Sequence, residues 1–122
     1  MNRWALLRHE INNNQICDIH YDFLIENGKD CLTWKILNLP EIDGIAVDIK
    51  DHINHRLIWL SIESKVLSNN RGYVQRIDNG TFILLESNLN KERFSLSLKG
   101  NLINGVLKKN GNFCQLFSLN NQ

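Results

Sequence analysis

The chain has 122 residues, of which 43% are hydrophobic and 22% are charged, the composition of an ordinary globular protein. Its formal net charge of +1 at pH 7 excludes a strongly basic protein that wraps nucleic acid, although it leaves room for a local basic groove. This length predicts a single domain, residues 1–122, with a hydrophobic core of its own.

The three cysteines, Cys17, Cys31 and Cys114, are widely spaced. An odd number without a close pair is the pattern of neither a disulfide framework nor a thiolate zinc cluster, and it favours a reducing compartment. The N-terminal residues hold too short an apolar run for a signal peptide, and no segment approaches the ~20 apolar residues of a membrane-spanning helix. We therefore expect a soluble, cytoplasmic protein with no membrane partner.

Short runs of strand-forming residues alternate with Asn-Gly and similar dipeptides, which tolerate the positive φ of tight turns. Turns are expected at 27–28, 43–44, 79–80, 100–101, 104–105 and 110–111. The predicted strands are 4–9, 19–26, 31–37, 56–62, 73–77, 81–86, 93–98, 103–107 and 113–117. The segment 41–54 is less regular and is compatible with a short helix. The pattern predicts an all-β fold, either an antiparallel barrel or a sandwich of short strands with little helix.

Residues 20–26, His-Tyr-Asp-Phe-Leu-Ile-Glu, form the stretch that most suggests chemistry. Alternate residues of a strand share a face, so His20 and Asp22 would lie side by side. Tyr21 and Phe23 would share the other face, which is suited to the core. An imidazole beside a carboxylate is the start of a mixed nitrogen and oxygen metal site. A solvated strand face carries the same residue types, so the stretch alone leaves both interpretations open.

His9 ends the first predicted strand and is followed by a polar loop at 12–15. If the chain turns back through this loop, His9 approaches His20 and Asp22. Two imidazoles and one carboxylate leave coordination positions open for water or substrate, as in catalytic sites for Mn²⁺, Fe²⁺ or Zn²⁺. The sequence therefore predicts a candidate metal site, with a supporting role at a strand end as the alternative for His9.

His55 is expected at the start of the strand 56–62, from where it could give a proton or a hydrogen bond to a bound anion. His52 is expected in the preceding loop, exposed to solvent. Arg71 and Arg76 follow, and guanidinium groups match phosphate oxygens bidentately. Arginines in such positions are equally typical of a solvated surface.

The order of these motifs resembles the phosphoesterase domain of bacterial DNA ligase D, and more closely its small stand-alone relatives. The shared set is a histidine on the first strand, His-Tyr-Asp-Phe at 20–23, a Thr-Trp strand, a histidine followed by an apolar strand ending in glutamate at 63, Arg-Gly at 71–72 and Asp-x-Gly-Thr at 78–81. The resemblance covers residues 4–107. It implies a compact antiparallel β-barrel that uses a divalent metal, typically manganese, to remove 3′-phosphates and 3′-terminal ribonucleotides in DNA repair.

Carried over residue by residue, the resemblance implies that His9, His20 and Asp22 hold the metal. It assigns His55 as the later active-site histidine, with His52 as the second choice. The implied partners are DNA or RNA/DNA 3′ ends and a separate ligase or polymerase.

The chain also departs from this family. Leu24 follows the Phe of the His-Tyr-Asp-Phe motif, where the ligase-linked enzymes carry an arginine, and the chain begins almost at the first strand, without the family's N-terminal arm. The expected mechanism is metal-assisted phosphoester hydrolysis in which Arg8, Arg71 or Arg76 brings further positive charge to the phosphate.

Two other functions are compatible with the sequence. Near-neutral charge and the missing arm favour a catalytically silent module that binds DNA ends or a repair partner, whose binding would be insensitive to a chelator. The pair His20 and Asp22 with a distant His55 also matches the ligand types of a non-haem Fe(II) oxygenase, although the chain is short for such an enzyme.

Overall fold

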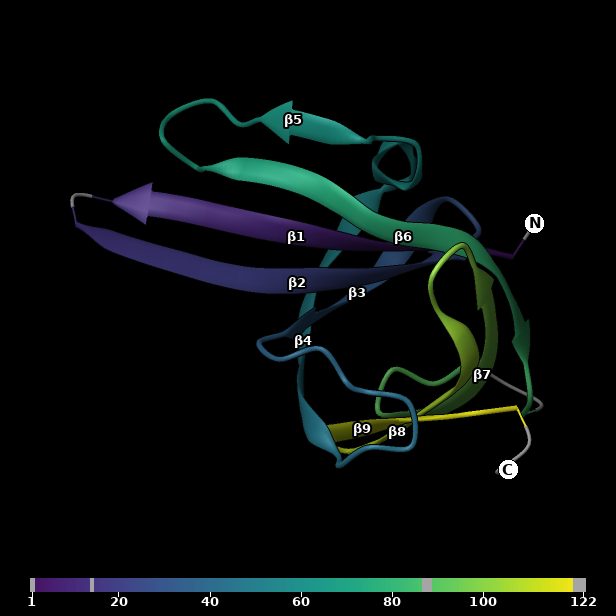
Figure 1. Ribbon diagram of the computed structural model, residues 1–122. Helices are drawn as coiled ribbons and strands as arrows, with labels where there is room; N and C mark the ends of the chain where they lie inside the picture. Colours follow the sequence, from purple (N-terminus) through teal and green to yellow (C-terminus); the bar gives the residue numbers. More distant parts are fainter. Residues whose placement is uncertain (1, 14, 87–88, 120–122) are drawn as a thin grey trace.

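The computed structural model describes residues 2–13, 15–86 and 89–119, which form one sheet and a single turn of 3₁₀ helix (Figure 1). The strands in this described part of the chain are β1 (Arg3–Asn13), β2 (Ile16–Asn27), β3 (Asp30–Ile36), β4 (Val47–Arg56), β5 (Ser64–Val66), β6 (Tyr73–Leu84), β7 (Arg93–Gly100), β8 (Asn104–Asn110) and β9 (Phe113–Phe117). The helical turn η1 (Leu57–Leu60) lies between β4 and β5. The prediction of a compact all-β fold with little helix is confirmed.

The strands follow the order β1-β2-β3-β4-β9-β8-β7-β6-β5, and all neighbours named here pair antiparallel. β1 also pairs with β6 along most of its length, which closes the sheet nearly into a ring (Figure 1). The short β5 is attached to the beginning of β6. Closure matters because an unpaired strand edge is a template for pairing with another chain.

The main core lies inside this ring and centres on Trp34. Its ring centroid lies 5.0 Å from that of Phe94 and 5.9 Å from that of Phe23. Burying each such side chain contributes about 1.5–3 kcal/mol. Because successive strand residues face opposite sides, β1 and β2 also supply a smaller second core on the outer face of the sheet, beneath η1. This second core contains Ala5, Leu7, Leu24, Cys31, Leu60 and Val74.

Two of the expected Asn-Gly turns are hairpin turns. Gly28, with φ +70°, joins β2 to β3, and Gly111, with φ +62°, joins β8 to β9. Asn79-Gly80 is different, because the two strands predicted at 73–77 and 81–86 are one continuous strand, β6. A Cβ at Gly80 would overlap the carbonyl oxygen of Lys99 on β7. The glycine is there for the close approach of two strands and not for a turn.

Gly80→Ala is expected to lower the free energy of unfolding by about 2–3 kcal/mol, because the added methyl group must push β6 away from the β7 backbone. Gly28→Ala is the matched control. Its methyl group would enter open space, so only the positive φ costs energy, roughly 1 kcal/mol. Urea denaturation measures both values. Equal losses in the two variants would show that the close approach at Gly80 has no energetic weight.

Asp78, from the Asp-x-Gly-Thr motif, is a buried carboxylate with a structural role. It is 3% exposed and accepts backbone N–H hydrogen bonds at 2.8–2.9 Å. The donors are Asn79, Asn101, Leu102 and Ile103. The last three form the turn between β7 and β8, so Asp78 fixes that turn against β6. A Cβ at Gly100 would press on the same carboxylate and on Trp4.

The strand predicted at 56–62 is wrong. β4 ends at Arg56, and the chain then forms η1, which places Leu57 and Leu60 on one side, against the second core. The segment 41–54, compatible with a short helix from sequence, instead contains most of β4, and its Ile49 is buried in the main core. The β1–β2 hairpin extends well past the predicted strand ends, and residue 14 of its expected polar loop lies outside the described residues. No helix in the described ranges is long and apolar enough to cross a membrane.

Candidate metal centre

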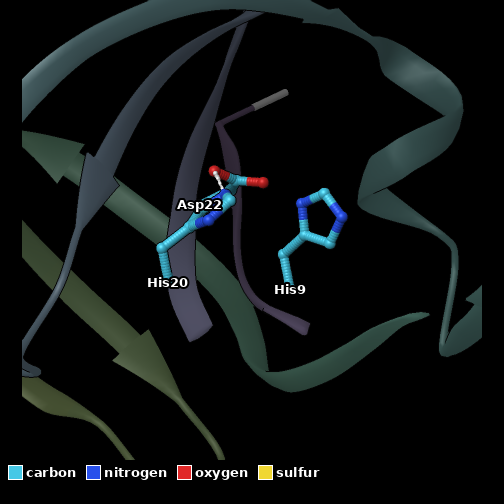
Figure 2. Close-up of side chains that lie close together, drawn as sticks. All are labelled: His9, His20 and Asp22. Carbon is cyan, nitrogen blue, oxygen red and sulfur yellow. Dashed lines mark ion pairs between the residues drawn. The ribbon is translucent and has the colours of Figure 1, made fainter. Parts of the chain in front are cut away.

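β1 and β2 pair so that His9 lies directly opposite His20. Figure 2 shows that these two side chains and Asp22 converge on the outer face of the sheet. One ligand atom from each of the three lies within 4.8 Å of the others, and the two imidazole centroids are 4.8 Å apart. The structure thus brings together the three residues expected to hold a metal.

Asp22 and His20 carry buried polar atoms that are not satisfied. Asp22 is 3% exposed, and its Oδ1 lies 3.2 Å from Nε2 of His20 (Figure 2). The two atoms form an ion pair, and neither has a hydrogen-bond partner among the described residues. Such atoms are rare, because each costs about 1–3 kcal/mol. Neighbouring ligands about 2.0–2.2 Å from a metal lie roughly 3–3.5 Å apart, so this pair fits a shared cation.

His9 is oriented from behind by the backbone. Its Nε2 lies 2.7 Å from the carbonyl oxygen of Arg71. A carbonyl oxygen only accepts hydrogen bonds, so Nε2 carries the proton and Nδ1 keeps its lone pair. Metal-binding histidines are commonly fixed in this way. The turn that presents this carbonyl depends on Gly72, with φ +102°, because a Cβ there would overlap the carbonyl oxygen of Glu10.

A second group of ligand atoms shares Asp22. One atom each from Asp22, His52 and His55 again lie within 4.8 Å of one another. Nε2 of His55 is 3.9 Å from Oδ2 of Asp22, and its Nδ1 donates a hydrogen bond of 3.0 Å to the carbonyl oxygen of Ile53. All four histidines of the chain therefore lie around one carboxylate.

An irregularity in β4 brings His52 and His55 to the same face. Thr33 of β3 pairs with His52 and Cys31 pairs with His55, so three residues of β4 span two residues of β3. Residues three apart in a regular strand face opposite sides of the sheet. The extra residue of this β-bulge brings the side chains of His52 and His55 to the same side. The expectation of a solvated loop position for His52 is wrong, because it is half-buried within β4.

Electrostatics at Asp22 and His52 favour the forms that bind cations. Burial raises the pKa of the Asp22 carboxyl, but the imidazoles of His20, His55 and His52 outweigh burial and hold that pKa below its usual value. Burial lowers the pKa of His52; Asp22 opposes this, and Lys35 and the neighbouring histidines add to it. The carboxyl is thus charged and His52 neutral near pH 7, as metal binding requires.

The three arginines expected to bind phosphate are engaged elsewhere in the structure. Arg8 alternates with His9 along β1 and so faces the opposite side of the sheet. Each guanidinium has a close neighbour: Arg8 pairs with Glu10, Arg71 donates to Ser68, and Arg76 lies 3.7 Å from Glu63. Arg71 contacts the candidate metal centre only through its carbonyl oxygen, which accepts the hydrogen bond from His9. A role for these arginines in phosphate binding stays a prediction.

A surface hollow of about 450 Å³ lies beside His52, and Lys91 lines it. The ammonium group of Lys91 donates a hydrogen bond of 2.7 Å to the carbonyl oxygen of His52 and pairs with Asp51. Lys91 belongs to the connection between β6 and β7, far along the chain from every histidine. No motif marks it.

The assignment of the centre depends on its geometry and on the types of its side chains. The relationship to DNA ligase D phosphoesterases stays a prediction. No protein-family model matches the chain, and no curated protein matches it.

Proposed function

We propose that this protein is a metal-dependent phosphoesterase that acts on the 3′ ends of nucleic acids and removes a 3′-phosphate or a 3′-terminal ribonucleotide. The observation that carries the proposal is the gathering of all four histidines around the buried Asp22. Oδ1 of Asp22 and Nε2 of His20 are buried without hydrogen-bond partners among the described residues. Buried polar atoms of this kind are rare, and an ion shared between them would satisfy both.

His9, His20 and Asp22 are the residues that would hold the cation. Mixed imidazole and carboxylate ligands suit Mn²⁺, Zn²⁺ or Fe²⁺, and the resemblance to the DNA ligase D phosphoesterases favours manganese. When bound, the cation polarises a phosphate oxygen and lowers the pKa of a coordinated water. The carbonyl oxygen of Arg71 accepts a hydrogen bond from Nε2 of His9, which leaves Nδ1 of His9 available for the cation.

His52 and His55 supply further groups beside the reacting phosphate, on the Oδ2 side of Asp22. Groups fixed where charge develops in the transition state act strongly, and removing one costs about 10²–10³ in rate.

Leu24 indicates where recognition differs from the ligase-linked enzymes. It is fully buried in the second core with Leu7 and Leu60, at the position where those enzymes carry an arginine. This protein therefore lacks one cation that could face the phosphate. We expect it to act more slowly than an enzyme with that arginine.

The test uses DNA primers labelled at the 5′ end that carry a 3′-phosphate or a single 3′-ribonucleotide. Metal-stripped protein with added MnCl₂ should convert both primers to 3′-hydroxyl products, and EDTA should stop the reaction. His20→Ala should lower the rate by at least about 100-fold, because it removes a metal ligand. Ile19→Ala, an exposed neighbour on β2, is the control and should keep full activity.

Two results would contradict the proposal. The first is no product at any Mn²⁺ concentration from a folded protein. The second is equal turnover by His20→Ala and the wild type. Binding of DNA ends that falls with salt but is unaffected by EDTA and by His20→Ala, without turnover, would identify the silent binding module instead.

A further inference from the structure

The two oxygens of Asp22 face different histidines. Oδ1 lies 3.2 Å from Nε2 of His20, and Oδ2 lies 3.9 Å from Nε2 of His55. Each oxygen belongs to its own set of ligand atoms, one completed by His9 and the other by His52. A single carboxylate therefore stands between two sets of imidazoles, which is the arrangement of a bridging ligand.

We propose that Asp22 bridges two cations: the first is held with His9 and His20, and the second with His52 and His55. The inference rests on the proposed function for the first cation and adds the second. It changes the role of His55 from the free proton donor expected from the sequence to a metal ligand.

The geometry of His55 supports a ligand role. Its Nδ1 carries the proton, because it donates to the carbonyl oxygen of Ile53, so the lone pair is on Nε2. Nε2 is too far from Oδ2 of Asp22 for a hydrogen bond. A cation between these two atoms would lie about 2.0–2.2 Å from each of them. Small shifts of the two side chains are enough to reach those distances. His9 has the same arrangement, with its other nitrogen on the carbonyl oxygen of Arg71.

The β-bulge in β4 is the second support. Without it, His52 and His55 would face opposite sides of the sheet, and only one could reach Asp22. The bulge interrupts the ladder with β3 and so gives up regular pairing. What it gains is a second imidazole at the carboxylate, with the ring centroids of His52 and His55 5.6 Å apart.

The charge of Asp22 decides what kind of ion fits between these groups. A phosphate held by His52 and His55 alone would lie against the Asp22 carboxylate and be repelled by it. A cation is attracted to the same oxygen. Paired cations about 3.5–4 Å apart hold the attacking and leaving oxygens in many phosphoester hydrolases, so the second ion suits the proposed reaction.

The test is metal content and spin coupling, measured on the full chain. Metal-stripped protein is equilibrated with MnCl₂, and bound manganese is determined by equilibrium dialysis and atomic emission. The wild type should bind two Mn²⁺ per chain, the double variant His52→Gln/His55→Gln one, and His9→Gln/His20→Gln one. The wild type should also show the broad electron paramagnetic resonance signal of a coupled Mn²⁺ pair, and each double variant the resolved signal of an isolated ion.

Circular dichroism verifies that the variants are folded. The electron paramagnetic resonance signal of the wild type tests for a coupled pair without any variant. One Mn²⁺ per chain at saturation, two uncoupled ions, or two ions that persist in His52→Gln/His55→Gln would each overturn the inference. Binding of one Mn²⁺ with full hydrolysis of the 3′-phosphate primer overturns only the second cation. Absence of bound manganese together with absence of turnover overturns the proposed function as well.

Discussion

Asp22→Asn is expected to lower the rate of 3′-end hydrolysis by at least about 1,000-fold, because a cation contributes several kcal/mol and each 1.36 kcal/mol is a factor of ten. The substitution keeps the shape of the side chain but removes its charge. Asp22 belongs to both groups of ligand atoms, so no remaining residue replaces it. Single-turnover rates on the 3′-phosphate primer measure the loss of rate, and calorimetric titration with MnCl₂ measures the loss of Mn²⁺ affinity.

The same variant should change the free energy of unfolding of the metal-free protein by less than about 1 kcal/mol, because the attraction of the histidines and the burial of the charge oppose each other. Asp18→Asn is the control, since Asp18 is an exposed aspartate on the same strand. It should leave rate and affinity unchanged. If a folded Asp22→Asn variant keeps full activity and full affinity for Mn²⁺, Asp22 is not the ligand proposed here.

Asp78→Ala is expected to produce the largest loss of stability, about 3–5 kcal/mol, because it leaves backbone N–H groups without their charged acceptor. Those donors belong to Asn79 and to the turn at Asn101, Leu102 and Ile103. For a domain of this length the melting temperature should fall by roughly 10–20 °C. Differential scanning calorimetry measures it.

Asp48→Ala is the control for that experiment, since Asp48 is an exposed aspartate on β4. It should shift the free energy of unfolding by no more than about 0.5 kcal/mol. Asp78→Asn should not rescue the loss, because its amide group donates on one side where the turn needs an acceptor. A melting temperature for Asp78→Ala close to that of the wild type would show that water satisfies the turn equally well.

The candidate ligands on β1 and β2 are predictable because they follow a local rule. Alternation in a strand places His20 and Asp22 on one face, and a hairpin return brings His9 opposite them. Both steps involve neighbouring strands and short sequence distances. The all-β fold was predictable for the same reason, since turn dipeptides and strand-forming runs are local signals.

The second half of the centre depends on pairing between strands, which sequence patterns do not reveal. The orientation of His52 follows from the β-bulge between the pairs Thr33–His52 and Cys31–His55. This bulge depends on how β3 and β4 pair with each other. The sequence predicts a turn at Gly80 because Asn-Gly has the same composition whether it bends the chain or lets two strands touch. The apolar run after Arg56 predicts a strand, and the structure has a short 3₁₀ turn there because such a turn buries apolar residues too.

The candidate ligands come from three strands, β1, β2 and β4, so two cations that share Asp22 would hold all three strands together. An ion that binds only the native chain adds about 2.7 kcal/mol at a hundredfold excess over its dissociation constant. Resistance to proteases in the cell should then rise and fall with the supply of free metal. A starved cell would lose the protein itself as well as its activity.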